Sequence, residues 1–126
     1  MSLRTPLAIA RNHGSAHDGV HHWWQQRLTA MALVPLLLWL VCAVVSLSQM
    51  DYMGAKQWLA EPLNATLSVL LTWVMAIHAR LGVQVILEDY VSTRWQEVLL
   101  QILTRFIAFA GAAAASLFIV MIAAGR

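Results

Sequence analysis

Long apolar runs alternate with short polar segments along the chain. The three runs cover residues 28–47, 63–87 and 98–124. Each is long enough to cross the roughly 30 Å of bilayer hydrocarbon, which takes about 20 helical residues. Backbone groups within lipid must be hydrogen-bonded inside their own segment, so we expect all three runs to be helices, with a bend at Pro35 in the first. The pattern predicts an all-α integral membrane protein, with residues 1–126 forming one membrane domain with three transmembrane helices.

Aromatic and basic residues indicate where the membrane boundaries lie and how the chain is oriented. Aromatic side chains flank the runs at Trp23, Trp24, Tyr52, Trp58, Tyr90 and Trp95. Basic residues on one side are Arg4, Arg11, Arg27 and Arg94, and on the other side Lys56 and Arg126. The positive-inside rule therefore predicts a cytoplasmic N-terminal segment, residues 1–27, and a C-terminus across the membrane.

The composition fits this class and excludes others. Hydrophobic residues make up 60% of the chain and charged residues 11%, with a mean hydropathy of +0.68. A net charge of +2 is too small to suggest nucleic-acid binding. The single cysteine, Cys42, offers neither a disulfide nor a cysteine-based metal site. No cleavage signal follows the first run, so we expect it to remain as a span.

A histidine, His78, lies deep in the second run. It precedes the predicted cytoplasmic end of that run by about 13 Å, at 1.5 Å per residue. Such an imidazole can hydrogen-bond to a neighbouring helix, or it can be an axial ligand of a haem iron. The predicted spans hold no other histidine, so a six-coordinate haem would take its second ligand from another subunit.

The residues after His78 add polar and small side chains to the same helix. At about 100° per residue, Gly82 and Asp89 share the face of His78, whereas Arg80 points about 160° away. Gly82 would leave room for a flat macrocycle or for a closely packed helix. Arg80 can extend to the headgroups, pair with an acidic group of a partner, or line a polar path. A channel lined by both Arg80 and His78 is disfavoured because the two side chains face apart.

The segment GVHHWWQQRLTA, residues 19–30, concentrates His21, Arg27 and two tryptophans just before the first run. An ordinary interfacial belt has the same composition. Alternatively, His21 and Arg27 lie on the side toward which His78 lies, where arginine can bind a haem propionate through paired hydrogen bonds and histidine can donate one.

Together, GVHHWWQQRLTA and the later HARLGVQVILEDYV, with its His-x3-Gly-x6-Asp-Tyr spacing, resemble the hydrophobic membrane-anchor subunit of bacterial succinate dehydrogenase, the small cytochrome b556 subunit of complex II. The resemblance covers all three predicted spans. It implies that His78 is an axial ligand of the haem b iron, with Arg27 and His21 near the propionates. It also implies that Tyr90 hydrogen-bonds a ubiquinone carbonyl, with Asp89 beside that site.

The resemblance further implies a subunit of the bacterial inner membrane that is not catalytic alone. Haem b would be shared with a second hydrophobic anchor, the large cytochrome b556 subunit. The sequence has no dinucleotide fingerprint and no cysteine set for a cluster, so a flavoprotein subunit and an iron-sulfur subunit would supply electrons to ubiquinone. This chain has His21-His22 where some members have His-Asp, and Arg80 has no family role.

Two alternatives stay open. One is the anchor of a quinol:fumarate reductase, in which the same site works in the opposite direction. The other is a cofactor-free assembly module of three helices, in which His78 only makes a hydrogen bond between helices.

Overall fold

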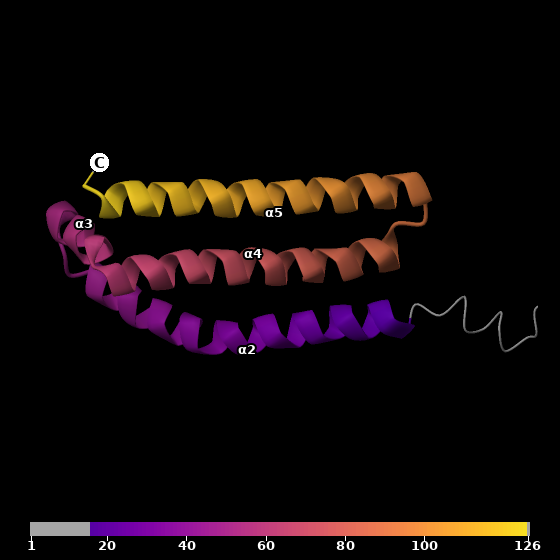
Figure 1. Ribbon diagram of the computed structural model, residues 1–126, viewed down its shortest axis with the longest axis horizontal. Helices are drawn as coiled ribbons and strands as arrows, with labels where there is room; N and C mark the ends of the chain where they lie inside the picture. The colour runs from indigo at the N-terminus through magenta and orange to yellow at the C-terminus, as the bar shows by residue number, and fades with distance from the viewer. Residues whose placement is uncertain (1–15, 126) are drawn as a thin grey trace, which may run out of the picture.

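A computed structural model of the chain describes the backbone of residues 16–125 and the side chains of residues 20–125. The helices in this part are α2 (Ala16–Leu47), α3 (Tyr52–Ala60), α4 (Pro62–Tyr90) and α5 (Arg94–Ala123). Figure 1 shows the three long helices side by side in one layer, with α4 between α2 and α5 and with α3 at the end where α2 meets α4. The prediction of an all-α protein with three helices able to span a membrane is confirmed.

The long helices extend beyond the predicted spans. GVHHWWQQRLTA belongs to α2, and Asp89 and Tyr90 end α4. The 29 residues of α4 measure about 44 Å, which matches a bilayer with its headgroup regions included. The cytoplasmic position of the N-terminal segment stays a prediction, and Arg4, Arg11 and Arg126, on which it partly rests, lie outside the described residues.

The connector after α2 contains a short helix that the hydrophobic pattern did not indicate. Asp51 caps α3 by accepting a hydrogen bond from the backbone N–H of Gly54 at 2.8 Å. Pro62 begins α4, where the missing N–H of proline is tolerated. Trp58 of α3 stacks on Trp39 of α2 with ring centroids 5.9 Å apart, and α3 also packs against α4 and α5.

Leucine side chains join α2 to α4. The buried cluster consists of Leu33, Leu36 and Leu71, with Trp39, Leu40, Leu67 and Val74 packed against it. Figure 1 shows that α2 bends partway along its length, and this helix contains Pro35, which removes one backbone hydrogen bond. The bend brings the C-terminal half of α2 toward α4.

The contact between α4 and α5 combines an aromatic pair with a hydrogen bond. The indole N–H of Trp73 donates to the hydroxyl of Ser116 at 3.0 Å. The Trp73 ring packs edge to face on Phe109, with centroids 5.6 Å apart. Ala112 is buried beside them, and its small side chain lets the helices approach closely. Most large apolar side chains elsewhere in the described chain are exposed, as expected for helices that face lipid or another membrane subunit.

Candidate functional site

His78 of α4 faces α2, where its Nδ1 lies 2.9 Å from the hydroxyl oxygen of Thr29. The same hydroxyl lies 2.8 Å from the backbone carbonyl oxygen of Gln25 and 3.1 Å from that of Gln26. A carbonyl oxygen can only accept, so when the hydroxyl proton is donated to one of these carbonyls, the hydroxyl oxygen accepts from Nδ1–H of His78. In that tautomer the lone pair of the imidazole is on Nε2.

This tautomer is the one that binds a metal through Nε2. Metal-ligating histidines donate their other ring N–H to a fixed acceptor, which orients the ring and raises its basicity. In residues 20–125 no three His, Cys, Asp or Glu side chains come together to hold a metal ion. A haem iron needs only an axial ligand from the protein, because the porphyrin supplies the other nitrogens. The hydrogen bond between helices and the axial-ligand role use different nitrogens of His78, so the two interpretations are compatible.

Gly82 lies one turn beyond His78, on the same face of α4. A side-chain carbon placed on Gly82 would approach only the amide nitrogen of Gln26, at 4.0 Å. This glycine is therefore not required for close contact with α2. On α2, the side-chain oxygen of Gln26 and Nε2 of His22 are buried without a hydrogen-bond partner among the described residues. The part of α2 that faces Gly82 therefore includes an unused polar atom, the side-chain oxygen of Gln26.

His21 and Arg27 both lie on α2, and the structure does not bring either of them to His78. His21 is exposed, and its Nε2 lies 2.9 Å from the side-chain nitrogen of Gln25. The guanidinium carbon of Arg27 lies 5.4 Å from the ring centroid of Trp23, in a cation–π contact. At about 100° per residue, Arg27 points about 160° away from Thr29 and hence away from α4. Their predicted role at haem propionates stays a prediction.

Tyr90 and Asp89 lie where α4 reaches the connector to α5. Tyr90 is 82% exposed, and Asp89 is also exposed. Glu88 is engaged with Gln84 at 2.8 Å, on another side of the helix. The phenol and the adjacent carboxylate are therefore free to meet a molecule that enters from the lipid or from a second subunit.

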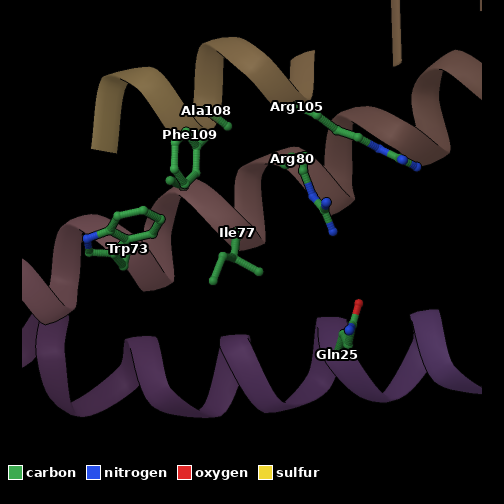
Figure 2. A pocket seen from close by; sticks show the side chains of 8 residues that line it. Gln25, Trp73, Ile77, Arg80, Arg105, Ala108 and Phe109 are labelled. Carbon is green, nitrogen blue, oxygen red and sulfur yellow. The ribbon is translucent and has the colours of Figure 1, made fainter. Parts of the chain in front are cut away.

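Two polar residues in this part of the bundle, Thr29 and Arg105, are not among the predicted site residues. Nothing in the sequence distinguishes Thr29 from the other threonines. Its contact with His78 depends on the register of α2 against α4, which the sequence pattern does not give. Arg105 lies within the third apolar run, and its charge inside a predicted span was a signal that could have found it. The structure places Arg105 and Arg80 on one cavity between the long helices (Figure 2).

Comparisons with known proteins agree with this architecture. Residues 1–122 match the family of succinate dehydrogenase/fumarate reductase transmembrane subunits. The succinate dehydrogenase hydrophobic membrane anchor subunit of Rickettsia bellii is similar, with 37% identity over 90 residues. The same subunit of Rickettsia conorii is 34% identical over 91 residues. Each alignment covers 71% of this chain and 72% of the relative. The same subunit of Paracoccus denitrificans is 30% identical over 93 residues, 71% of this chain and 70% of the relative. The resemblance inferred from the two motifs is confirmed. The chain belongs to the family of succinate dehydrogenase/fumarate reductase transmembrane subunits.

Proposed function

We propose that this chain is the hydrophobic membrane anchor of a bacterial inner-membrane succinate dehydrogenase, and that it helps to bind haem b and to form the ubiquinone-reduction site. The observation that carries the proposal is the hydrogen bond between Nδ1 of His78 and Thr29, which leaves Nε2 available for an iron. Relatives that share more than two thirds of their length with this chain are named as such anchors, which supports the same role.

Haem b, when bound, supplies a one-electron centre whose potential depends on its axial ligands. His78 would hold the iron from this chain, and a second hydrophobic anchor subunit would provide the opposite ligand. The missing side chain of Gly82 would leave room for part of the macrocycle on the face of α4 that holds His78. His21 and Arg27 lie toward the end of α2 that adjoins the C-terminal half of α4, and there they would interact with the propionates.

Ubiquinone reduction would take place near the end of α4. The phenol of Tyr90 can donate one hydrogen bond to a quinone carbonyl while the isoprenoid tail stays in hydrocarbon. Quinone reduction also consumes protons, and the exposed carboxylate of Asp89 would help to deliver them from the aqueous side. Tyr90 lies about 18 Å along the helix axis from His78, so the quinone headgroup and the iron ligand occupy different depths.

Partner subunits complete the activity. A flavoprotein subunit would oxidise succinate, and an iron-sulfur subunit would carry electrons to the quinone at the end of the bundle that holds Tyr90. The exposed apolar faces of α2, α4 and α5 would contact lipid and the second anchor.

The test is a dithionite-reduced minus oxidised absorption spectrum of the purified complex, with wild type, His78→Ala and Gln84→Ala compared. Gln84 is a matched control because it also lies on α4, faces about 120° away from His78, and hydrogen-bonds to Glu88 at 2.8 Å. We expect a b-type signal in the wild type and in Gln84→Ala, and its loss or distortion in His78→Ala. An unchanged spectrum in His78→Ala would rule out the ligand assignment. An intact wild-type complex without haem would instead favour the cofactor-free assembly module.

The same residues would serve a quinol:fumarate reductase, and the family description covers both enzymes. Turnover of the intact complex distinguishes them. A succinate dehydrogenase reduces quinone with succinate faster than it reduces fumarate with quinol, and the opposite ratio would assign the chain to the reductase.

A further inference from the structure

A cavity of about 310 Å³ lies between the long helices and receives side chains from α2, α4 and α5. Figure 2 shows Arg80 of α4 and Gln25 of α2 pointing toward each other across it. Arg105 of α5 extends toward the end of the bundle at which α2 begins (Figure 2). Trp73 and Phe109 form its apolar part with their edge-to-face contact. We refer to this cavity, lined by Gln25, Trp73, Arg80, Arg105 and Phe109, as the arginine cleft.

Two positive charges in the arginine cleft lack an acidic partner within the described chain. Nε of Arg80 is buried and has no hydrogen-bond partner there. The carboxylates nearest to the cleft along α4 and α5 are Glu88 and Glu97, and they accept hydrogen bonds from Gln84 and Gln101 at 2.8 and 3.1 Å. Two cations in a setting of low dielectric constant repel each other and are costly to desolvate. The cleft is therefore suited to an anion that comes from outside this chain.

The depth of the arginine cleft limits what that anion can be. Arg80 lies about 15 Å from the end of α4 and Arg105 about 16 Å from the start of α5, at 1.5 Å per residue. Since the helices exceed the hydrocarbon core by about 7 Å at each side, both backbones lie roughly 8–9 Å inside it. An arginine side chain that extends toward the nearer surface reaches the headgroup level or close to it. A ligand with its charge at that level and its apolar body in the hydrocarbon would match this geometry.

We propose that the arginine cleft binds an anionic phospholipid, with its phosphate on Arg80 and Arg105 and an acyl chain against Trp73 and Phe109. Guanidinium groups present paired N–H donors that match phosphate oxygens. Basic pockets between membrane helices bind anionic headgroups in this way. A zwitterionic lipid fits less well because its headgroup would bring another cation to the two arginines. None of the residues proposed to bind haem or quinone lines the cleft, although His21 adjoins it, since its Nε2 lies 2.9 Å from the side-chain nitrogen of Gln25.

The experiment measures lipid bound to the intact purified complex by native mass spectrometry, with phosphatidylglycerol and phosphatidylcholine as probes. The variants are Arg80→Gln, Arg105→Gln and the charge-retaining Arg80→Lys. Arg94→Gln is the matched control, because Arg94 is an exposed arginine at the start of α5 that does not line the cleft. Loss of hydrogen bonds to a charged group predicts that each glutamine variant binds phosphatidylglycerol about tenfold or more weakly than wild type. Arg94→Gln should bind it like wild type, and Arg80→Lys should lie between.

Several outcomes would overturn the proposal. One is equal affinity of the wild type for the two lipids, and another is the same loss in Arg94→Gln as in Arg105→Gln. Inorganic phosphate that displaces the lipid at equal concentration would mean that the site recognises a free anion instead. Release of a subunit from Arg80→Gln with unchanged lipid content would mean that a partner's carboxylate occupies the cleft. If Arg80→Gln does not assemble, Arg105→Gln and Arg80→Lys still decide the matter, because Arg105 is exposed and lysine keeps the charge.

Discussion

Replacement of Thr29 by valine is the sharpest perturbation of the proposed haem site. Valine keeps the β-branched shape of threonine, so the helix and its packing change little. It removes the one hydroxyl of the described residues that contacts His78 and leaves Nδ1 without this partner. The imidazole is then free to carry its proton on Nε2, where it would block an iron.

The expected size of the effect follows from the single hydrogen bond that is lost. Such a bond contributes about 0.5–1.5 kcal/mol net. A loss of about 1 kcal/mol weakens haem retention about fivefold, since about 1.4 kcal/mol corresponds to a factor of ten. The donated N–H makes the imidazole more electron-rich and favours ferric iron, so its loss should raise the midpoint potential. For a one-electron couple, about 1 kcal/mol sets an upper limit of about 40 mV on that rise.

The assay is haem content per complex, together with a redox titration of its b-type absorption. Thr29→Ser restores a hydroxyl and should return both values toward wild type. Thr72→Val is the matched control, because the hydroxyl of Thr72 donates only within α4, to the carbonyl oxygen of Ser68 at 2.8 Å. Unchanged haem content and potential in Thr29→Val would refute the proposal that the contact with Thr29 supports His78 as a ligand. Equal changes in Thr72→Val would show that the effect comes from general packing.

Three further predictions concern other parts of the bundle. Tyr90→Phe should slow quinone reduction and leave haem content near wild type, whereas Tyr52→Phe, on α3, should leave both unchanged; normal quinone kinetics in Tyr90→Phe would count against the quinone site. Arg27→Ala should shift the haem spectrum or midpoint potential if the guanidinium reaches a propionate, and an unaltered spectrum and potential would leave it with only its tryptophan contact. Leu81→Ala should destabilise the fold by about 2–4 kcal/mol, because Leu81 is only 1% exposed, while the exposed Leu70→Ala should cost much less; thermal unfolding of the detergent-solubilised complex measures the difference.

The helices could be predicted because membrane spans are dictated by local composition. An apolar run of about 20 residues has few alternatives to a helix in lipid, whatever its neighbours are. The short helix α3 is different, because it depends on the cap at Asp51 and on the stacking of Trp58 against Trp39. The cap is local to α3, but the stacking requires α2 to be in place, and neither contact belongs to a long apolar run, so the hydrophobic pattern did not indicate this helix.

The candidate site was predicted in part. His78 was identified from its depth, but its partner Thr29 lies 49 residues away, and only the register between α2 and α4 brings them together. Arg27 is expected near a haem because it lies on the side of the membrane toward which His78 lies, and because the resemblance implies it. The structure continues α2 through that segment, and this fixes the direction of Arg27 away from α4. Contacts between helices and directions around a helix are tertiary properties, and the composition of a segment does not determine them.

The position of α4 between α2 and α5 has a consequence for how the chain enters the membrane. The most apolar window of α4 has a mean hydropathy of 1.6, compared with 2.6 for α2 and 2.4 for α5. Its polar side chains are costly in lipid alone, and two of them, His78 and Trp73, gain hydrogen bonds only from the helices on either side. Insertion of the middle span is therefore coupled to its neighbours. The higher hydropathy of α2 and α5 favours their transfer into the bilayer without other helices, whereas α4 becomes stable there when it packs between them.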